Sequence, residues 1–273
     1  MLPSFQYLAP RTRAELHAAL ADNGPEASLL AGGTDLLVNI RAGLAHPKVV
    51  VDVKKVREFA AIAWSEQDGL IVHAGTTIND VLRHPRVQGD YPLLAACAHD
   101  LASYQIRNRA TVVGNVVNAS PCSDMAPALL CLNARAVISS RRGEREVPFK
   151  EFFQGVRKTV VQPDEVLERI VVPAAAAGAR GNYHKLKRIN GHDLGIVGVA
   201  LLLRPDGDMR IGISSCAPTP LLVENLYASL SADAVVAAAM EVIRPISDVR
   251  ATKEYREHMV QVFVRRLLDE VKP

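Results

Sequence analysis

The sequence lacks long apolar runs and blocks of like charge, and each absence excludes a class of protein. No apolar stretch reaches the roughly eighteen residues needed for a membrane-spanning helix. The first ten residues lack a basic region followed by an apolar segment, so we expect a cytoplasmic protein without a membrane span. The 32 basic and 29 acidic residues are interspersed and leave a formal net charge of +3. Without a basic tract, we expect no nucleic-acid partner.

Side chains with metal-binding or nucleophilic chemistry are present, but they do not fall into known motifs. The four cysteines include no C-x-x-C pair and the histidines show no H-E-x-x-H spacing, so we predict free buried thiols and no metal ligands. No Ser/His/Asp, Cys/His or paired-carboxylate arrangement stands out, so we assign no catalytic residue. The chain also lacks a G-x-x-x-x-G-K-S/T loop and a G-x-G-x-x-G fingerprint, which excludes the common nucleotide-binding motifs.

Two segments poor in large side chains carry most of the information, residues 31–36 and 111–115. We expect each to follow a strand, and in the first, Gly32 and Gly33 remove side chains that would keep backbone N–H groups away from a ligand. Such N–H groups, together with the positive end of a following helix, favour an anion. Either segment alone can also be an ordinary tight turn. Acting together, the two could hold a diphosphate from both sides.

The rest of the chain alternates between helical and strand patterns, which predicts mixed α and β structure. The spacing of Thr12 and Glu15 predicts a helix that ends near Gly24. Further helices are expected after Thr77, over 92–103 and from Asp124 to 132. Strands are expected over 49–53, 70–74 and 166–172, with a hairpin over 134–147.

The run of small residues from Pro173 to Gly178 is the clearest composition shift, and we place a domain boundary there. This gives a first domain over 1–173, divided near 55–60, and a second over 174–273. In the second we expect a three-stranded antiparallel sheet (183–189, 196–203 and 209–215) covered on one face by two helices. The last helix, 253–271, carries an apolar stripe expected to be core: Tyr255, Met259, Val262, Phe263 and Leu267.

Several motifs occur in the order and spacing of one protein family. They are residues 31–36, 106–108, 111–115, 118–121 with Asp124, 127–129, 183–188 with Asp193, and 247–250 with Tyr255 and Arg256. The whole chain resembles the medium, FAD-binding subunit of the molybdenum hydroxylases, relatives of xanthine dehydrogenase, aerobic carbon monoxide dehydrogenase and 4-hydroxybenzoyl-CoA reductase. The resemblance implies an α+β fold: a two-part FAD-binding domain, PCMH-like or vanillyl-alcohol-oxidase-like, followed by the family's C-terminal domain.

The resemblance also implies roles for individual residues. The two turns would hold the FAD diphosphate, Asp124 would lie near the ribose or adenosine end, and Lys185 would approach the isoalloxazine ring and favour the reduced flavin. Asp193 would orient that ring. The implied cofactor-binding residues are Leu30, Ala31, Gly32, Gly33, Thr34, Asp35, Leu36, Thr111, Val112, Val113, Gly114, Asn115, Asp124, Lys185 and Asp193.

Each of these side chains also has a purely structural alternative. Asp124 could simply cap a helix, Lys185 could belong to a solvated strand edge, and Asp193 could mark the start of the next strand. Val113 stands where the family commonly has glycine, and a β-branched residue disfavours positive φ. Tyr183 and Tyr104 are read as packing residues and are left out of the site.

The implied complex contains a large subunit with a molybdenum cofactor and a small subunit with 2Fe-2S clusters, assembled as a dimer of heterotrimers. This chain would pass electrons from those clusters through FAD to an external acceptor such as NAD or oxygen. It lacks the inserted cysteine-bearing loop of 4-hydroxybenzoyl-CoA reductases, so no cluster is expected here. The alternatives are a self-contained FAD-dependent oxidoreductase of the same superfamily and a flavin-free assembly module.

Overall fold

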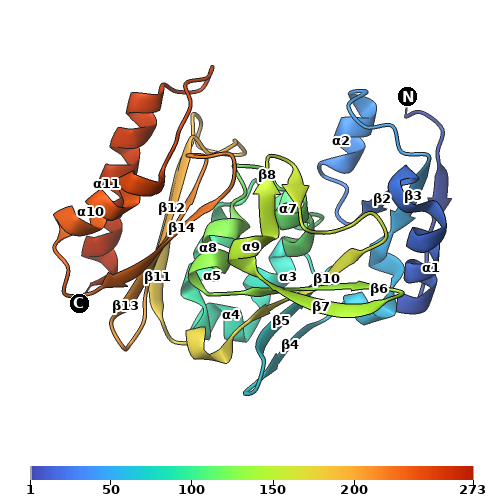
Figure 1. Ribbon diagram of the computed structural model, residues 1–273, viewed down its shortest axis with the longest axis horizontal. Coiled ribbons are helices and arrows are strands. Elements are labelled where there is room, and N and C mark those ends of the chain that lie inside the picture. Colours follow the sequence, from blue (N-terminus) through green and yellow to red (C-terminus); the bar gives the residue numbers. More distant parts are fainter. Residues whose placement is uncertain (1, 273) are drawn as a thin grey trace.

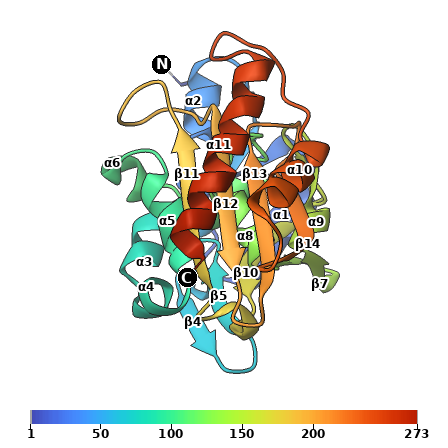
Figure 2. The ribbon, with the colours of Figure 1, turned by 90° about the vertical axis from the view of Figure 1, so that its left-hand side faces the viewer.

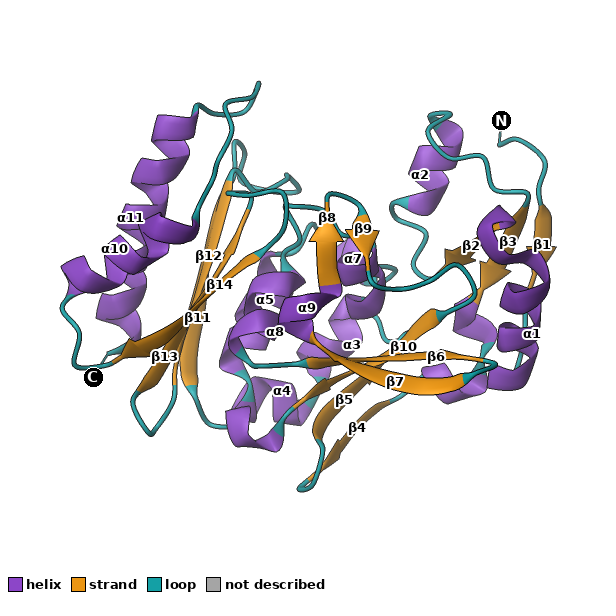
Figure 3. Ribbon diagram, in the orientation of Figure 1, coloured by secondary structure: helices purple, strands orange, loops and turns teal. Residues whose placement is uncertain are grey.

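Three larger sheets follow one another along the long axis of the molecule, with helices between and outside them (Figure 1). The computed structural model describes residues 2–272. Helices and strands both occur along the whole length of the fold, as Figure 3 shows by colour. Within this range, no helix combines the length and the apolar character needed to cross a bilayer.

The first sheet is parallel and has the strand order β1-β3-β2, formed by β1 (Gln6–Leu8), β2 (Ala27–Leu30) and β3 (Val49–Asp52). Helix α1 (Arg13–Asn23) packs beside it, and the Thr12 side chain accepts a hydrogen bond from the Glu15 N–H, which confirms the predicted cap. The apolar side chains of β3 are fully buried at the centre of this sheet. Both β2 and β3 run parallel, so their carboxyl ends meet at one edge.

The second sheet is antiparallel and has the strand order β4-β5-β10-β6-β7. Its strands are β4 (Ile62–Ser65), β5 (Gly69–His73), β6 (Arg135–Ser140), β7 (Gly143–Pro148) and β10 (Val166–Val172). Helix α2 (Leu36–Arg41) belongs to the connection from β2 to β3 in the first sheet. The helices that accompany the second sheet are α3 (Ile78–Arg83), α4 (Pro85–Asp90), α5 (Pro92–Asp100), α6 (Tyr104–Arg107), α7 (Val112–Val117), α8 (Met125–Cys131) and α9 (Phe149–Phe152). A small ribbon of β8 (Phe153–Gly155) and β9 (Lys158–Thr159) follows α9.

The third sheet has four antiparallel strands where the sequence predicted three. Its strands are β11 (Arg180–Leu186), β12 (Val197–Leu203), β13 (Asp208–Ser214) and β14 (Leu221–Tyr227), in that order. The edge strand β14 was missed because only Val223 and Leu226 are buried in it and Asn225 has a positive φ of 61°, so its apolar alternation is weak. Helices α10 (Ala232–Val242) and α11 (Lys253–Val271) cover the outer face (Figure 2).

The other face of this sheet packs against α5 and α8, so the third sheet is buried between two helical layers. The fit is close: a Cβ placed on Gly212 of β13 would lie 2.4 Å from the Pro127 carbonyl oxygen of α8. The hydrophobic core of the first 180 residues therefore continues into β11 and β12 through Tyr183, Ala200 and Leu202.

The predicted apolar stripe on α11 is wrong at its first position. Tyr255 is 47% exposed, whereas its neighbour Arg256 is 2% exposed. Phe263 and Leu267 are buried as predicted, and Met259 and Val262 are half-buried against the same core. The stripe begins at Arg256 because the guanidinium of that residue finds backbone acceptors inside the domain.

Candidate functional site

The first turn connects the end of β2 to the start of α2, as the sequence predicted. Its two glycines are needed for different reasons. Gly33 has a φ of +74°, in the left-handed region that favours glycine. Gly32 has ordinary dihedrals, but a Cβ there would lie 2.2 Å from the carbonyl oxygen of Arg109. Gly33 is therefore needed for its backbone conformation, and Gly32 is needed because the Arg109 backbone packs directly against it.

The second turn does not follow a strand, which corrects the prediction. Residues 111–115 form the start of helix α7, and the element before them is helix α6. The Thr111 hydroxyl accepts a hydrogen bond from the Gly114 N–H at 2.9 Å and caps the helix. Val113 is helical and 5% exposed and its side chain joins the core, so a β-branched residue needs no unusual backbone conformation here.

The two turns lie against each other although they are far apart in the sequence. Gly32 packs on the backbone of Arg109 and Ala110, and a Cβ on Gly114 would lie 3.7 Å from the Ala31 Cβ. The Ala110 carbonyl in turn accepts a hydrogen bond from the Ile78 N–H at 2.9 Å, which anchors the second segment to α3.

Six backbone N–H groups of these two turns donate no hydrogen bond to a backbone or side-chain acceptor within residues 2–272. They belong to Gly32, Gly33, Thr34, Asp35, Leu36 and Val113, whereas the bridge between Thr77 and Thr111 engages the neighbouring Val112. Backbone N–H groups are obligatory donors, so unpaired ones gathered at one place call for an acceptor from outside the chain. A diphosphate offers several charged acceptor oxygens, and N–H nests of this kind bind phosphates. The donor set therefore fits the linker of a dinucleotide cofactor.

Lys54 braces the first turn, and sequence reasoning missed it. Its ammonium group donates to the Ala31 carbonyl at 2.7 Å and to the Asp52 carboxylate at 2.7 Å. Tyr7 donates to the same carboxylate at 2.7 Å. Burial alone would raise the pKa of Asp52, but the hydrogen bonds from Lys54 and Tyr7 outweigh it and hold that pKa below its usual value. The available signal was a lysine just past a buried parallel strand.

Asp124 and Lys185 form a buried ion pair in which Nζ lies 2.9 Å from the carboxylate. The Lys185 side chain is 1% exposed, so it is not part of a solvated strand edge. Asp124 occupies the N-cap position of α8, but its side chain makes no capping hydrogen bond. The two side chains thus lie at one place in the fold, and the predicted roles of Asp124 at the adenosine end and of Lys185 at the ring stay predictions.

Tyr183 completes this cluster through its hydroxyl, which donates to Asp124 Oδ1 at 3.1 Å. Burial raises the pKa of Tyr183 well above its usual value, and the nearby Asp124 carboxylate adds to that rise. Burial likewise raises the pKa of Asp124, an effect that Lys185 partly offsets. Tyr183 therefore packs and donates a hydrogen bond, while Tyr104 is 59% exposed.

Asn115 connects the second turn to this ion pair. Its Oδ1 accepts hydrogen bonds from the Ser123 hydroxyl at 2.7 Å and from the Met125 N–H at 3.3 Å, on either side of Asp124. The side chain thus fixes the start of α8 against α7 and leaves its amide group free of partners within the described chain.

Asp193 lies apart from the ion pair, in the connection between β11 and β12. Its carboxylate accepts from the Arg188 N–H at 3.0 Å and from the Arg188 guanidinium at 3.3 Å. These bonds lower the pKa of Asp193 to about 2. It therefore holds the connection together, and it neither starts β12, which begins at Val197, nor contacts Lys185 by a hydrogen bond.

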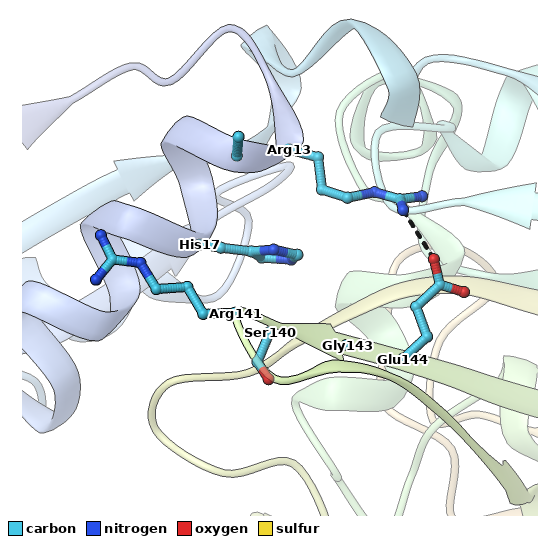
Figure 4. Close-up of a pocket in the computed structure, with 7 residues that line it drawn as sticks. Arg13, His17, Ser140, Arg141, Gly143 and Glu144 are labelled. Atoms are coloured by element: carbon cyan, nitrogen blue, oxygen red, sulfur yellow. Dashed lines mark hydrogen bonds and ion pairs between the residues drawn. The ribbon is translucent and has the colours of Figure 1, made fainter.

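Cavities also lie outside the turns, and two of them border residues of the described chain that could in principle bind a ligand. One of about 460 Å³ lies between α1 and the β6–β7 hairpin and is lined by Arg13, His17, Arg141 and Glu144 (Figure 4). Arg13 is already paired there with Glu144 at 2.8 Å and with buried Glu168, so its charge is used within the fold. The other cavity, of about 430 Å³, borders the ends of α2 and α7 and is lined by Asn39, Leu44, Val117, Asn118 and Arg157.

The remaining thiols and acidic groups give no second site. All four cysteines are free; Cys97, Cys131 and Cys216 are buried as predicted, whereas Cys122 is only half-buried. Burial raises the pKa of Cys97 well above its usual value, so this thiol is protonated and inert. Within residues 2–272, no three His, Cys, Asp or Glu side chains form a group able to hold a metal ion.

Two family models together match almost the whole chain. The family described as "FAD binding domain in molybdopterin dehydrogenase" matches residues 3–175. The family described as "CO dehydrogenase flavoprotein C-terminal domain" matches residues 181–271. The two matches meet at the stretch of small residues that the sequence analysis singled out.

Individual relatives agree along their full length. The carbon monoxide dehydrogenase medium chain of Hydrogenophaga pseudoflava is 33% identical over 98% of this chain and 96% of its own. A xanthine dehydrogenase FAD-binding subunit of Escherichia coli is 30% identical over 97% of this chain and 94% of its own. A solved structure of the Hydrogenophaga pseudoflava carbon monoxide dehydrogenase superposes with a TM-score of 0.92 at 32% identity, covering 99% of this chain and 98% of that one.

Proposed function

The chain belongs to the family of FAD-binding subunits of the molybdenum hydroxylases, and we propose that it holds FAD as an electron-transfer station within a larger complex. Electrons would arrive from iron-sulfur clusters of a partner subunit and leave to an external acceptor such as NAD or oxygen. Bound FAD supplies the redox chemistry, because it can exchange electrons with both kinds of partner. The chain supplies binding, orientation and electrostatics.

The unpaired N–H groups of the two touching turns carry this proposal. They are preorganised by Gly32, by the Thr111 cap and by Lys54, so their positions need no rearrangement to receive a diphosphate. Preorganised donors cost less ordering free energy on binding than flexible ones.

The buried ion pair supports placing the reactive ring beside β11. Lys185 would approach the isoalloxazine and favour its reduced, more negative form, while Asp124 would fix the ammonium group in place. In a buried site, a fixed positive charge acts on its neighbour far more strongly than in water. Asp193 would act more remotely, by shaping the connection that passes over Lys185.

The partners follow from the relatives. One relative is the medium chain of a carbon monoxide dehydrogenase, a name that implies a larger and a smaller chain beside it. The solved structure of that enzyme lacks the Mo-pyranopterin moiety of its molybdenum cofactor, so the complete enzyme contains molybdenum. We place the molybdenum cofactor on the large partner, the 2Fe-2S clusters on the small one, and the assembly in a dimer of heterotrimers. A self-contained FAD oxidoreductase would need none of these.

Purification of the tagged chain from its native host tests the proposal. We expect two further polypeptides to co-elute, together with molybdenum, iron and the visible absorption of oxidised flavin. A chain that elutes alone with flavin and oxidises a substrate would favour the self-contained enzyme. A chain that binds no added FAD would favour the assembly module and overturn the proposal.

A further inference from the structure

The sequence motif formed by residues 247–250 and Arg256 has no role in the site described so far. Arg256 lies near the start of α11 and is 2% exposed, although it carries a full positive charge. A buried charge is costly unless several hydrogen-bond partners compensate it. The partners of this guanidinium therefore indicate what the residue is for.

The Arg256 guanidinium joins three separate loops. One terminal nitrogen donates to the Ile196 carbonyl and, at 3.3 Å, to the Ser215 carbonyl. The other donates to Asp248 Oδ1 at 2.8 Å, and Asp248 Oδ1 also accepts the Arg250 N–H at 2.8 Å. Asp248 thus stabilises the loop to which it belongs and connects that loop to Arg256.

One arm of this junction leads to Asp124. The Ser215 N–H donates to the Pro121 carbonyl at 2.8 Å, and Pro121 lies three residues before Asp124 in a short connection. Ser215 has a positive φ of 66°, so this bend is held in an uncommon conformation. Arg250 of the same motif also contacts the Cys122 thiol at 3.6 Å, within that connection.

The other arm leads to Lys185. The Ile196 N–H donates to the Leu186 carbonyl at 2.8 Å, which closes the β11–β12 connection directly after Lys185. A Cβ on Gly195 would lie 3.4 Å from Lys185 Cε, so the backbone at this point packs on the lysine side chain. The Ser215 hydroxyl donates to the Gly195 carbonyl at 2.9 Å and ties the two arms together.

We propose that Arg256 is a positioning residue for the Asp124–Lys185 ion pair. Its planar guanidinium holds the backbones that carry both members, so the ammonium group keeps one fixed position beside the cofactor. A lysine at 256 offers a single point of charge and cannot span the same acceptors. The inference rests on the proposed function, since it concerns the effect of the pair on FAD.

The test uses the full chain loaded with FAD and compares Arg256→Lys, Asp248→Asn and Lys185→Met. The readout is the FAD midpoint potential, measured alongside flavin content and thermal stability. Lys185→Met is expected to lower the affinity for reduced relative to oxidised FAD at least about tenfold, which is about 30 mV for a two-electron couple. Arg256→Lys and Asp248→Asn are expected to shift the midpoint potential in the same direction by at least about 15 mV, which is a threefold change in the ratio of the two affinities.

The double variant Lys185→Met/Arg256→Lys separates positioning from general destabilisation. If Arg256 acts through Lys185, adding Arg256→Lys to Lys185→Met moves the potential no further. The matched control is Arg265→Lys on the same helix, whose guanidinium pairs with Asp233 at the surface; it should leave the potential unchanged.

Two results would overturn the inference. One is a wild-type potential in both Arg256→Lys and Asp248→Asn, with flavin retained. The other is a full additional shift in the double variant, which would mean that Arg256 acts independently of Lys185. A wild-type chain that binds no FAD would instead contradict the proposed function itself, so the two failures are distinguishable.

Discussion

Replacing Gly32 with alanine should separate the two turns and release FAD. The added Cβ would lie 2.2 Å from the Arg109 carbonyl oxygen and 2.8 Å from the Ala110 Cα, whereas real Cβ atoms keep at least 3.0 Å from such neighbours. The two backbones must therefore move apart by about 0.8 Å. Overpacking of this kind costs about 1–3 kcal/mol of folding stability.

The consequence for binding is larger than for the fold. An N–H···O hydrogen bond of about 2.9 Å stretched by 0.8 Å is no longer a hydrogen bond. One such bond to a charged acceptor contributes about 1.5–3 kcal/mol, so the loss of one raises the FAD dissociation constant by roughly ten- to a hundredfold.

The assay is a titration of flavin-free chain with FAD, followed by quenching of flavin fluorescence. The matched control is Gly89→Ala in α4, where an added Cβ meets no atom within 4 Å and φ is ordinary. Gly89→Ala should bind FAD like the wild type. Unchanged affinity in Gly32→Ala would refute the reasoning that the two turns hold the cofactor between them.

Three further predictions concern the support of the site. Lys54→Met should raise the FAD dissociation constant about tenfold, measured by the same titration, because the Ala31 carbonyl loses its brace; equal affinity would remove Lys54 from the site. The folded-state pKa of Asp52 lies below its unfolded value, so its stabilisation is complete above about pH 4 and is lost as the pH falls through the lower folded value. Acid unfolding followed by circular dichroism should therefore be less pH-dependent in Asp52→Asn than in the wild type, and identical slopes would contradict this. Asp124→Ala should lower the free energy of unfolding in urea by about 3–5 kcal/mol, because it leaves Lys185 buried without a partner; a loss below about 1 kcal/mol would mean that the lysine escapes to solvent.

The local features of the site could be predicted from the sequence, because they depend on neighbouring residues. The first turn, its following helix and the Thr12 cap are examples, since glycine, threonine and apolar spacing act over a few positions. The identification of the family also rested on short motifs kept in order. The Thr111 segment was recognised for its composition, but it caps a helix rather than ending a strand.

The contacts between distant segments could not be predicted in this way. Nothing local indicates that Gly32 meets Arg109, or that Asp124 and Lys185 pair. Both depend on the packing of whole helices against sheets. The misplacement of Tyr255 at the start of the α11 stripe has the same origin: the periodicity was right, but the buried position belonged to Arg256, whose acceptors come from three other loops.

Backbone amide hydrogen exchange with and without FAD tests the central claim most directly. The account predicts that FAD slows exchange at residues 32–36 and at Val113, where N–H groups have no acceptor within residues 2–272. The exposed hairpin turn at Gly143 should be unaffected. If FAD binds tightly while exchange at both turns stays unchanged, the diphosphate lies elsewhere and the account is contradicted.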